Sequence, residues 1–307
     1  QVRLFQAQES RFVGIISSYD VRMGSACLKD VEEVTSASET NDVVEVEFHG
    51  LNILQSLNSH VLGLRVWPAS IFLSSYVVEV LGGECLRGSS VIELAAGCGL
   101  VGLVAAKLGA KVTLSDLPAL VPHLEANVLL NVAKAPRVTV SDIAFGNDLR
   151  DRFSRKNVDY IFLSDATCAT DLFPKVVATL LQLANDKTVV LLACPPRDPR
   201  QLLFEAFKAA LGISFQIQDI EIDTQTSNRW MESAAVTHPG SKICAQDLQG
   251  ISLLRVTLKQ NVTEHIDANI EDQLVKSNAN IAGCKACSGV GCGLCRKRNP
   301  NATSILK

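Results

Sequence analysis

Residues 91–118 constrain the fold of this chain more than any other part of its sequence. They open with a short apolar run, 91–95, which is typical of a strand buried on both faces of a parallel sheet. The stretch 97–102 matches the pattern G-x-G-x-x-G, in which glycine permits a tight turn and a close approach of the backbone to a ligand. A helix that ends at Gly109 and a second strand should follow. The segment therefore predicts a strand–turn–helix–strand unit.

Asp116 lies at the tip of the second predicted strand of this unit. A carboxylate at that point can accept hydrogen bonds from both hydroxyls of a ribose, because its two oxygens match two neighbouring donors. This arrangement is typical of a site for an adenosine-containing cofactor. The alternative role for Asp116 is a helix N-cap before Pro118, since aspartate is favoured at such positions.

Glu93 distinguishes between the cofactors that such a unit can bind. It lies inside the first predicted strand, before Gly97. A dinucleotide site gains nothing from a carboxylate there, because its pyrophosphate binds at the helix N-terminus. S-adenosyl-L-methionine carries no phosphate but a positive sulfonium and a positive amino group, which an acidic residue near the turn suits. We therefore expect S-adenosyl-L-methionine rather than a nicotinamide cofactor, with a solvated strand-end charge as the alternative role for Glu93.

Three segments in this order resemble the seven-β-strand methyltransferases of family 16, many of which are protein-lysine methyltransferases. They are residues 65–70 (RVWPAS), 93–102 (ELAAGCGLVG) and 115–118 (SDLP), and the resemblance covers about residues 45–260. It implies a class I (Rossmann-like) methyltransferase fold, which is an α/β fold with a doubly wound, seven-stranded and mostly parallel sheet. It also implies methyl transfer to a lysine side chain of a protein substrate.

The order of predicted elements agrees with this fold class, because strands that alternate with helices indicate a parallel, doubly wound sheet. Two further strands, 214–222 and 251–259, are joined by a polar loop without a helical pattern, so we expect them to pair antiparallel at one edge. The remaining predictions are strands near 12–17, 43–48, 90–95, 111–115, 137–141, 158–164 and 187–193, and helices near 68–80, 100–108, 118–131, 171–185 and 199–211.

In such a sheet the ligand lies beyond the carboxyl ends of the strands, near the point where the strand order reverses. The resemblance sets Asp142 beside the adenine, although a turn-capping role is the alternative, and core packing is the alternative for Trp67. Cys98 is interpreted as a small filler rather than a nucleophile, because no histidine lies nearby in sequence, and His123 is expected at the surface. The predicted cofactor-binding residues are Trp67, Glu93, Gly97, Cys98, Gly99, Asp116, Leu117, Asp142 and Ile143.

Asp165, at the end of the strand predicted over 158–164, is the expected catalytic residue. Its carboxylate could hold the acceptor ammonium near the reacting methyl group while water carries the proton away. The family pattern here is Asp-x-x-Tyr, whereas this chain has Cys168, and a thiol offers no ring for a cation–π contact. Ala95 also stands where many members have glycine. A small-molecule methyltransferase, or a cofactor-binding scaffold with weakened catalysis, therefore remain alternatives.

The C-terminal tail carries two Cys-x-x-Cys motifs, formed by Cys284, Cys287, Cys292 and Cys295. Four closely spaced thiols predict a structural zinc site, because thiolate sulfur is a preferred zinc ligand in tetrahedral geometry. An iron–sulfur cluster, redox-active thiols or a cysteine-rich tail without metal are the alternatives.

Composition bounds the class of protein. The formal net charge of -3 over 307 residues argues against a general nucleic-acid binder. The sequence shows no apolar run of membrane-spanning length, and its single scattered cysteines favour a reduced, cytoplasmic location, with the nucleus also possible. The expected organisation is an N-terminal arm over 1–40, the methyltransferase domain over 41–260, a linker over 261–280 and the Cys-rich tail over 281–300.

Overall fold

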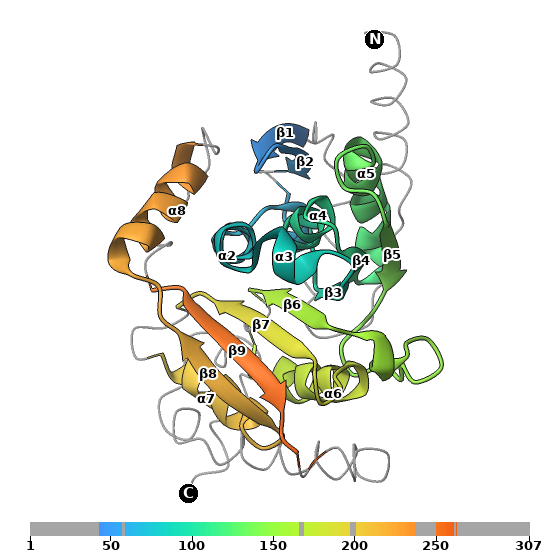
Figure 1. The fold of residues 1–307 in the computed structure, drawn as a ribbon, viewed down its shortest axis with the longest axis vertical. Coiled ribbons are helices and arrows are strands. Elements are labelled where there is room, and N and C mark those ends of the chain that lie inside the picture. The colour runs from blue at the N-terminus through green and yellow to red at the C-terminus, as the bar shows by residue number, and fades with distance from the viewer. Residues whose placement is uncertain are drawn as a thin grey trace, which may run out of the picture.

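The computed structural model describes residues 43–56, 59–165, 169–196, 201–236, 250–260 and 262. The predicted N-terminal arm with its strand and the Cys-rich tail lie outside these residues, as does the predicted linker apart from Val262. A seven-stranded sheet runs through the described part, with helices on both of its faces (Figure 1). Its strands are β3 (Ser90–Leu94), β4 (Lys111–Asp116), β5 (Val138–Asp142), β6 (Tyr160–Ser164), β7 (Val189–Cys194), β8 (Phe215–Ile220) and β9 (Ser252–Leu258).

The strand order is β5-β4-β3-β6-β7-β9-β8. The five strands β3 to β7 pair in parallel, whereas β9 pairs antiparallel with both β7 and β8. The predicted seven-stranded sheet with an antiparallel pair at one edge is confirmed. The chain adds β4 and β5 on one side of β3 and then continues with β6 and β7 on the other side. The switch point, where α/β sheets bind ligands, therefore lies at the carboxyl ends of β3 and β6.

Two layers of helices bury two separate cores. Leu73, Val101 and Leu124 belong to the core on one face, and Leu180 and Phe207 belong to the core on the other. Burial of both faces explains why β3, β6 and β7 read as continuous apolar runs. The first layer holds α2 (Pro68–Tyr76), α3 (Gly82–Leu86), α4 (Leu100–Lys107) and α5 (Val121–Asn131), and the second holds α6 (Phe173–Leu183) and α7 (Leu202–Leu211).

The helix predicted from Pro68 to about Val80 starts as expected, with proline in its first turn. Its α-helical part ends at Tyr76, and a wider π turn, η2 (Val77–Leu81), joins it to α3. Among the described residues, this continuous segment is long and apolar enough to cross a membrane. Because 56% of its most apolar window is buried inside the fold, it has the character of a core helix.

A hairpin that precedes the sheet is formed by β1 (Val43–Phe48), which was predicted, and β2 (Leu51–Ser56), which was not. His49 and Gly50 connect the two strands, and both have positive φ angles, 49° and 72°. Two such residues are typical of the tight turns whose twist matches that of a hairpin.

The polar loop expected between β8 and β9 is wrong for its first part, which forms α8 (Thr224–Val236). Asp223 caps this helix, because its Oδ1 accepts a hydrogen bond of 2.9 Å from the Thr226 amide. Trp230 is buried and packs edge-on against Phe72 of α2, with ring centroids 5.1 Å apart. Tertiary packing of one large aromatic side chain thus outweighs the weak helix propensity of the surrounding Asn, Ser and Thr residues.

Candidate active site

The glycine turn between β3 and α4, residues Gly97 to Gly99, forms the centre of the site. Gly99 has φ +78°, and a Cβ atom at this position would lie 2.8 Å from a methyl group of Leu114. At Gly102, in the first turn of α4, a Cβ atom would lie 2.3 Å from the other methyl of Leu114. Glycine is therefore required for the turn and for the close packing of α4 against β4.

Asp116 joins the tip of β4 to this turn. Its Oδ2 accepts a hydrogen bond from the Gly97 amide at 2.8 Å, and its Oδ1 accepts one from the Leu117 amide at 2.7 Å. Burial raises the pKa of this carboxyl group, and the two backbone bonds oppose that rise. Each oxygen keeps a further lone pair, so Asp116 can hold the turn and still accept from the two hydroxyls of a ribose.

Glu93 lies beneath the turn rather than on its open side, since only 1% of it is exposed. Its Oε2 accepts a hydrogen bond of 2.6 Å from the Gly102 amide, one of the donors that the first turn of α4 cannot satisfy by itself. Burial, together with the nearby Asp116, raises the pKa of Glu93 to about 8. The structure therefore gives Glu93 a supporting position beneath the turn, and its contact with a cofactor stays a prediction.

The acidity of this turn indicates the charge of its ligand. Glu93 and Asp116 are both buried, and the second oxygen of Glu93, Oε1, has no hydrogen-bond partner in the described structure. A nearby phosphate would disfavour ionisation of these carboxyl groups even further, whereas a cationic ligand lowers their raised pKa values and stabilises their ionised forms. These residues fit S-adenosyl-L-methionine, whose sulfonium and amino groups are positive.

The expected adenine-side residues lie on the neighbouring strand ends. Strand pairing sets Asp142 directly beside Asp116, and the Ile143 amide donates to the Asp116 carbonyl at 2.9 Å. Asp142 forms a 2.6 Å ion pair with Arg152, so that one of its oxygens is already engaged. Leu117 is 39% exposed beside these groups and offers an apolar surface.

Trp67 stands immediately before α2, where it is half-buried. Its indole nitrogen donates a 2.9 Å hydrogen bond to the Leu62 carbonyl, and the Arg65 guanidinium lies 5.5 Å from the ring centroid. The neighbouring Gly63 approaches the glycine turn, because a Cβ atom on Gly97 would lie 3.1 Å from the Gly63 carbonyl oxygen. The segment that holds Trp67 therefore borders the turn, as the predicted cofactor contact requires.

The expectation that His123 lies at the surface is wrong. His123 is only 6% exposed, and its Nε2 lies 3.5 Å from the Cys98 sulfur. Burial lowers the pKa of His123 to about 4 and raises the pKa of the Cys98 thiol. Both groups are therefore neutral near pH 7 and do not form the thiolate–imidazolium pair of a cysteine nucleophile.

Asp165, the expected catalytic residue, follows β6 at the switch point. Pairing of Leu94 with Leu163 sets the end of β6 beside the start of the glycine turn, and the Asp165 amide donates to the Ala193 carbonyl at 3.0 Å. Asp165 has φ +61° and Ala95 has φ +50°, a left-handed conformation that is uncommon for residues other than glycine. Such backbone strain is often found at functional sites. Cys168, at the family's tyrosine position, lies outside the described residues.

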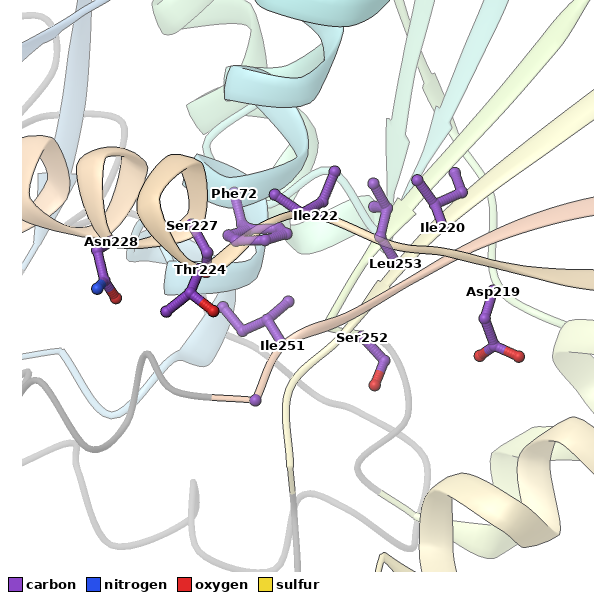
Figure 2. Close-up of a pocket in the computed structure, with 11 residues that line it drawn as sticks. Phe72, Asp219, Ile220, Ile222, Thr224, Ser227, Asn228, Ile251, Ser252 and Leu253 are labelled. Carbon is purple, nitrogen blue, oxygen red and sulfur yellow. The ribbon is translucent and has the colours of Figure 1, made fainter.

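A pocket of about 420 Å³ opens at the same edge of the sheet, where β8 ends and β9 begins. Figure 2 shows Phe72, Thr224 and Ile251 grouped at one end of it and Asp219 apart from them at the other. Ser252 of its wall pairs with the end of β7, which in turn pairs with the end of β6. Because neighbouring strands lie about 4.8 Å apart, two such spacings separate Ser252 from the end of β6, on the side away from the cofactor turn.

Sequence reasoning missed two asparagines of α5, Asn127 and Asn131, which are buried and bind backbone groups of β2 and of the glycine turn. Two polar residues one helical turn apart on a buried face were the signal that could have identified them. The four predicted zinc ligands lie outside the described residues. Within those residues, no group of three or more His, Cys, Asp or Glu side chains is arranged to hold a metal ion.

Comparison with known proteins agrees with this geometry. The sequence profile of the family described as lysine methyltransferase matches residues 45–208. Protein N-lysine methyltransferase METTL21A of Danio rerio is 35% identical over 179 residues, which are 58% of this chain and 79% of that protein. The same protein of Mus musculus is 34% identical over 179 residues, again 58% and 79% of the two chains. EEF1A lysine methyltransferase 3 of Mus musculus is 29% identical over 199 residues, which are 62% of this chain and 83% of that protein. The chain is therefore an S-adenosyl-L-methionine-dependent methyltransferase that belongs to the lysine methyltransferase family.

Proposed function

We propose that this protein transfers a methyl group from S-adenosyl-L-methionine to a lysine side chain of a protein substrate. The position of Asp165 carries the proposal, because it sets a carboxylate at the carboxyl end of β6, one strand from the glycine turn. Relatives named as protein N-lysine methyltransferases support the same acceptor. The pocket at the start of β9 supports an acceptor that extends beyond one side chain.

Different residues of the site interact with the cofactor and with the acceptor. The bound cofactor supplies an electrophilic methyl group on its sulfonium. Asp116 and the glycine turn would hold the cofactor, and Glu93 holds the first turn of α4 in place. Asp165 would attract the acceptor ammonium and hold its nitrogen towards the methyl group, while water removes the proton that must leave before the N–C bond forms. As that bond forms, the bond between sulfur and methyl would break, with S-adenosylhomocysteine as the leaving group.

Transfer of labelled methyl groups into proteins of a cell lysate tests the proposal. The purified full chain should label one or a few protein bands, and hydrolysis of these bands should release labelled methyl-lysine. Asp165→Asn should reduce labelling by about 100-fold, because a neutral amide no longer attracts the ammonium. Asp186→Asn is the matched control, since Asp186 is exposed in the turn before β7, at the opposite edge of the sheet.

The possible outcomes separate the alternatives. Label found only in small molecules would replace the protein acceptor with a small-molecule one. S-adenosylhomocysteine binding without any methyl transfer would indicate a cofactor-binding scaffold. Equal activity of Asp165→Asn and Asp186→Asn would remove Asp165 from the catalytic role.

We also propose that the Cys-rich tail binds zinc and that the protein acts in the cytoplasm, with the nucleus as the alternative compartment. The spacing of the two Cys-x-x-Cys motifs supports a four-thiolate site. Metal analysis of the full chain should find one zinc ion, which is lost when Cys284 and Cys287 are both replaced by serine. A metal-free wild-type chain, purified under reducing conditions with zinc present, would refute the zinc proposal.

Fractionation of cells that express the protein tests the proposed compartment.

A further inference from the structure

One buried side chain, Asn127 of α5, touches both the N-terminal hairpin and the cofactor turn. Its Oδ1 accepts a hydrogen bond from the Leu54 amide at 2.7 Å, and its Nδ2 donates to the Leu54 carbonyl at 3.2 Å. The same Nδ2 donates to the carbonyl of Cys98, in the glycine turn, at 3.0 Å. Asn127 has no exposed surface, so all of its hydrogen-bonding groups are directed at protein partners.

Asn131, one helical turn later, binds the same hairpin, but within the described residues no hydrogen bond joins its side chain to the glycine turn. Its Oδ1 accepts from the Asn52 amide at 3.0 Å, and its Nδ2 donates to the Asn52 carbonyl at 2.7 Å. The two asparagine amides thus pair with alternate residues of β2, as a neighbouring strand would. The opposite edge of β2 pairs with β1, so α5 supplies the partners that the second edge of this hairpin needs.

We propose that Asn127 is a positioning residue that couples closure of the β1–β2 hairpin on α5 to cofactor binding at the glycine turn. The carbonyl of Cys98 is held by Asn127, while the amide of the preceding Gly97 is held by Asp116. The turn is therefore anchored from α5 as well as from β4. Loss of either anchor leaves buried backbone groups unpaired and allows the turn to move away from the geometry that the cofactor requires.

This coupling must act in both directions, because an allosteric coupling free energy is reciprocal. If the ordered hairpin helps Asn127 to hold the turn, then a ligand that orders the turn must also stabilise the hairpin. The inference concerns cofactor binding, which precedes any choice of acceptor. Its test therefore does not depend on whether the acceptor is a lysine of a protein.

A matched pair of variants of the full chain tests the inference. Asn127→Ala and Asn131→Ala each remove a pair of bonds to β2 and introduce the same helix-favouring residue into α5. Only Asn127→Ala also removes the bond to Cys98, together with a 3.4 Å contact with His123. Only Asn131→Ala removes a 2.9 Å bond within α5, from its Nδ2 to the Asn127 carbonyl. Calorimetric titration with S-adenosylhomocysteine should give a dissociation constant about tenfold higher for Asn127→Ala, the effect of one lost buried hydrogen bond. Asn131→Ala should differ from wild type by less than about twofold.

Hydrogen exchange of the wild-type protein provides a second measurement, which needs no variant to fold. Saturation with S-adenosylhomocysteine should slow exchange of the Asn52 and Leu54 amides. Both amides belong to the hairpin and not to the glycine turn where the ligand is expected to bind. In Asn131→Ala the effect at Leu54 should persist, and in Asn127→Ala it should disappear. Equal weakening of ligand binding in both variants would reduce Asn127 to a purely structural role. Hairpin exchange that does not respond to the ligand in wild type would overturn the coupling.

Discussion

The Asp116 carboxylate accepts a 2.8 Å hydrogen bond from the amide of Gly97, so the tip of β4 holds the glycine turn that follows β3. A second aspartate makes the same kind of bond at the other end of β3, because Asp159 accepts from the Ser90 amide, also at 2.8 Å. Only the first of these bonds lies at the carboxyl edge of the sheet, where the cofactor is expected. We therefore expect Asp116 to contribute to cofactor binding and Asp159 to contribute only to the stability of the fold.

Asp116→Asn should weaken S-adenosylhomocysteine binding by about 100-fold, because the amide loses one acceptor that both the turn and the ribose need. Asp159→Asn should lower the denaturation midpoint but leave the dissociation constant within about twofold of wild type. Calorimetric titration and urea denaturation measure the two effects. Equal weakening of ligand binding in both variants would show that Asp116 acts through stability alone.

Ala95→Gly should make the protein more stable. Ala95 has φ +50°, a left-handed conformation that costs a residue with a Cβ atom about 1 kcal/mol relative to glycine. Removal of that strain should raise the melting temperature by about 2–4 °C in a domain of this size. Ala96→Gly is the control and should lower it, because Ala96 is buried and is not among the residues with positive φ. A lower melting temperature for Ala95→Gly would contradict this reading of the turn.

Glu93 should make the stability of the ligand-free protein fall as the pH rises. Its pKa is raised from 4.5 to about 8 by burial and by Asp116, so the folded state binds this proton more tightly than the unfolded state does. The resulting stabilisation is complete below pH 4.5 and is lost as the pH rises to about 8. Glu93→Gln should flatten this dependence, and urea denaturation at several pH values between 5 and about 8.5 measures it. Parallel curves for the two proteins would assign the dependence to other groups.

Substitution of Asp165 by glycine should stabilise the fold and abolish methyl transfer. With φ at +61°, Asp165→Gly should be about 1 kcal/mol more stable than Asp165→Ala, although both lack the carboxylate. Both variants should lose methyl transfer and retain S-adenosylhomocysteine binding. Thermal melting compares their stabilities, and calorimetric titration confirms ligand binding. If Asp165→Ala keeps full activity, the carboxylate of Asp165 has no catalytic role.

Changes in the pocket at the start of β9 should alter the binding of the methyl acceptor and leave the binding of the cofactor unchanged. Asn228 lines it from the exposed side of α8, so Asn228→Trp fills the pocket without disturbing the buried core. The KM for a protein acceptor should rise about tenfold, since an occupied pocket no longer receives part of the substrate. Asn228→Ala is the control and should leave this KM within about twofold of wild type. A rise in the dissociation constant of S-adenosylhomocysteine would instead indicate damage to the fold.

Local patterns were enough to predict most of the sheet and the glycine turn. The unit from β3 to β4 has its turn, helix and acidic strand tip within one short stretch, so neighbouring residues specify it. The segment that became α8 could not be predicted in this way. Its own residues favour a loop, and it forms a helix because Trp230 packs against Phe72, which lies far away in the sequence.

The fold class, the cofactor-binding turn and the strand ends that carry Asp116 and Asp165 all follow from the order of the amino acids. These features depend on residues that are close together in the chain. The groups that hold the turn in place come together only when the chain folds. Glu93 lies beneath the turn, His123 lies against Cys98, and Asn127 connects the turn to the hairpin. The last two contacts bring together residues from separate elements, and burial determines the charge of Glu93 and His123. The spacing of Asn127 and Asn131 could have indicated two buried polar residues, but no local pattern reveals which backbone groups they bind.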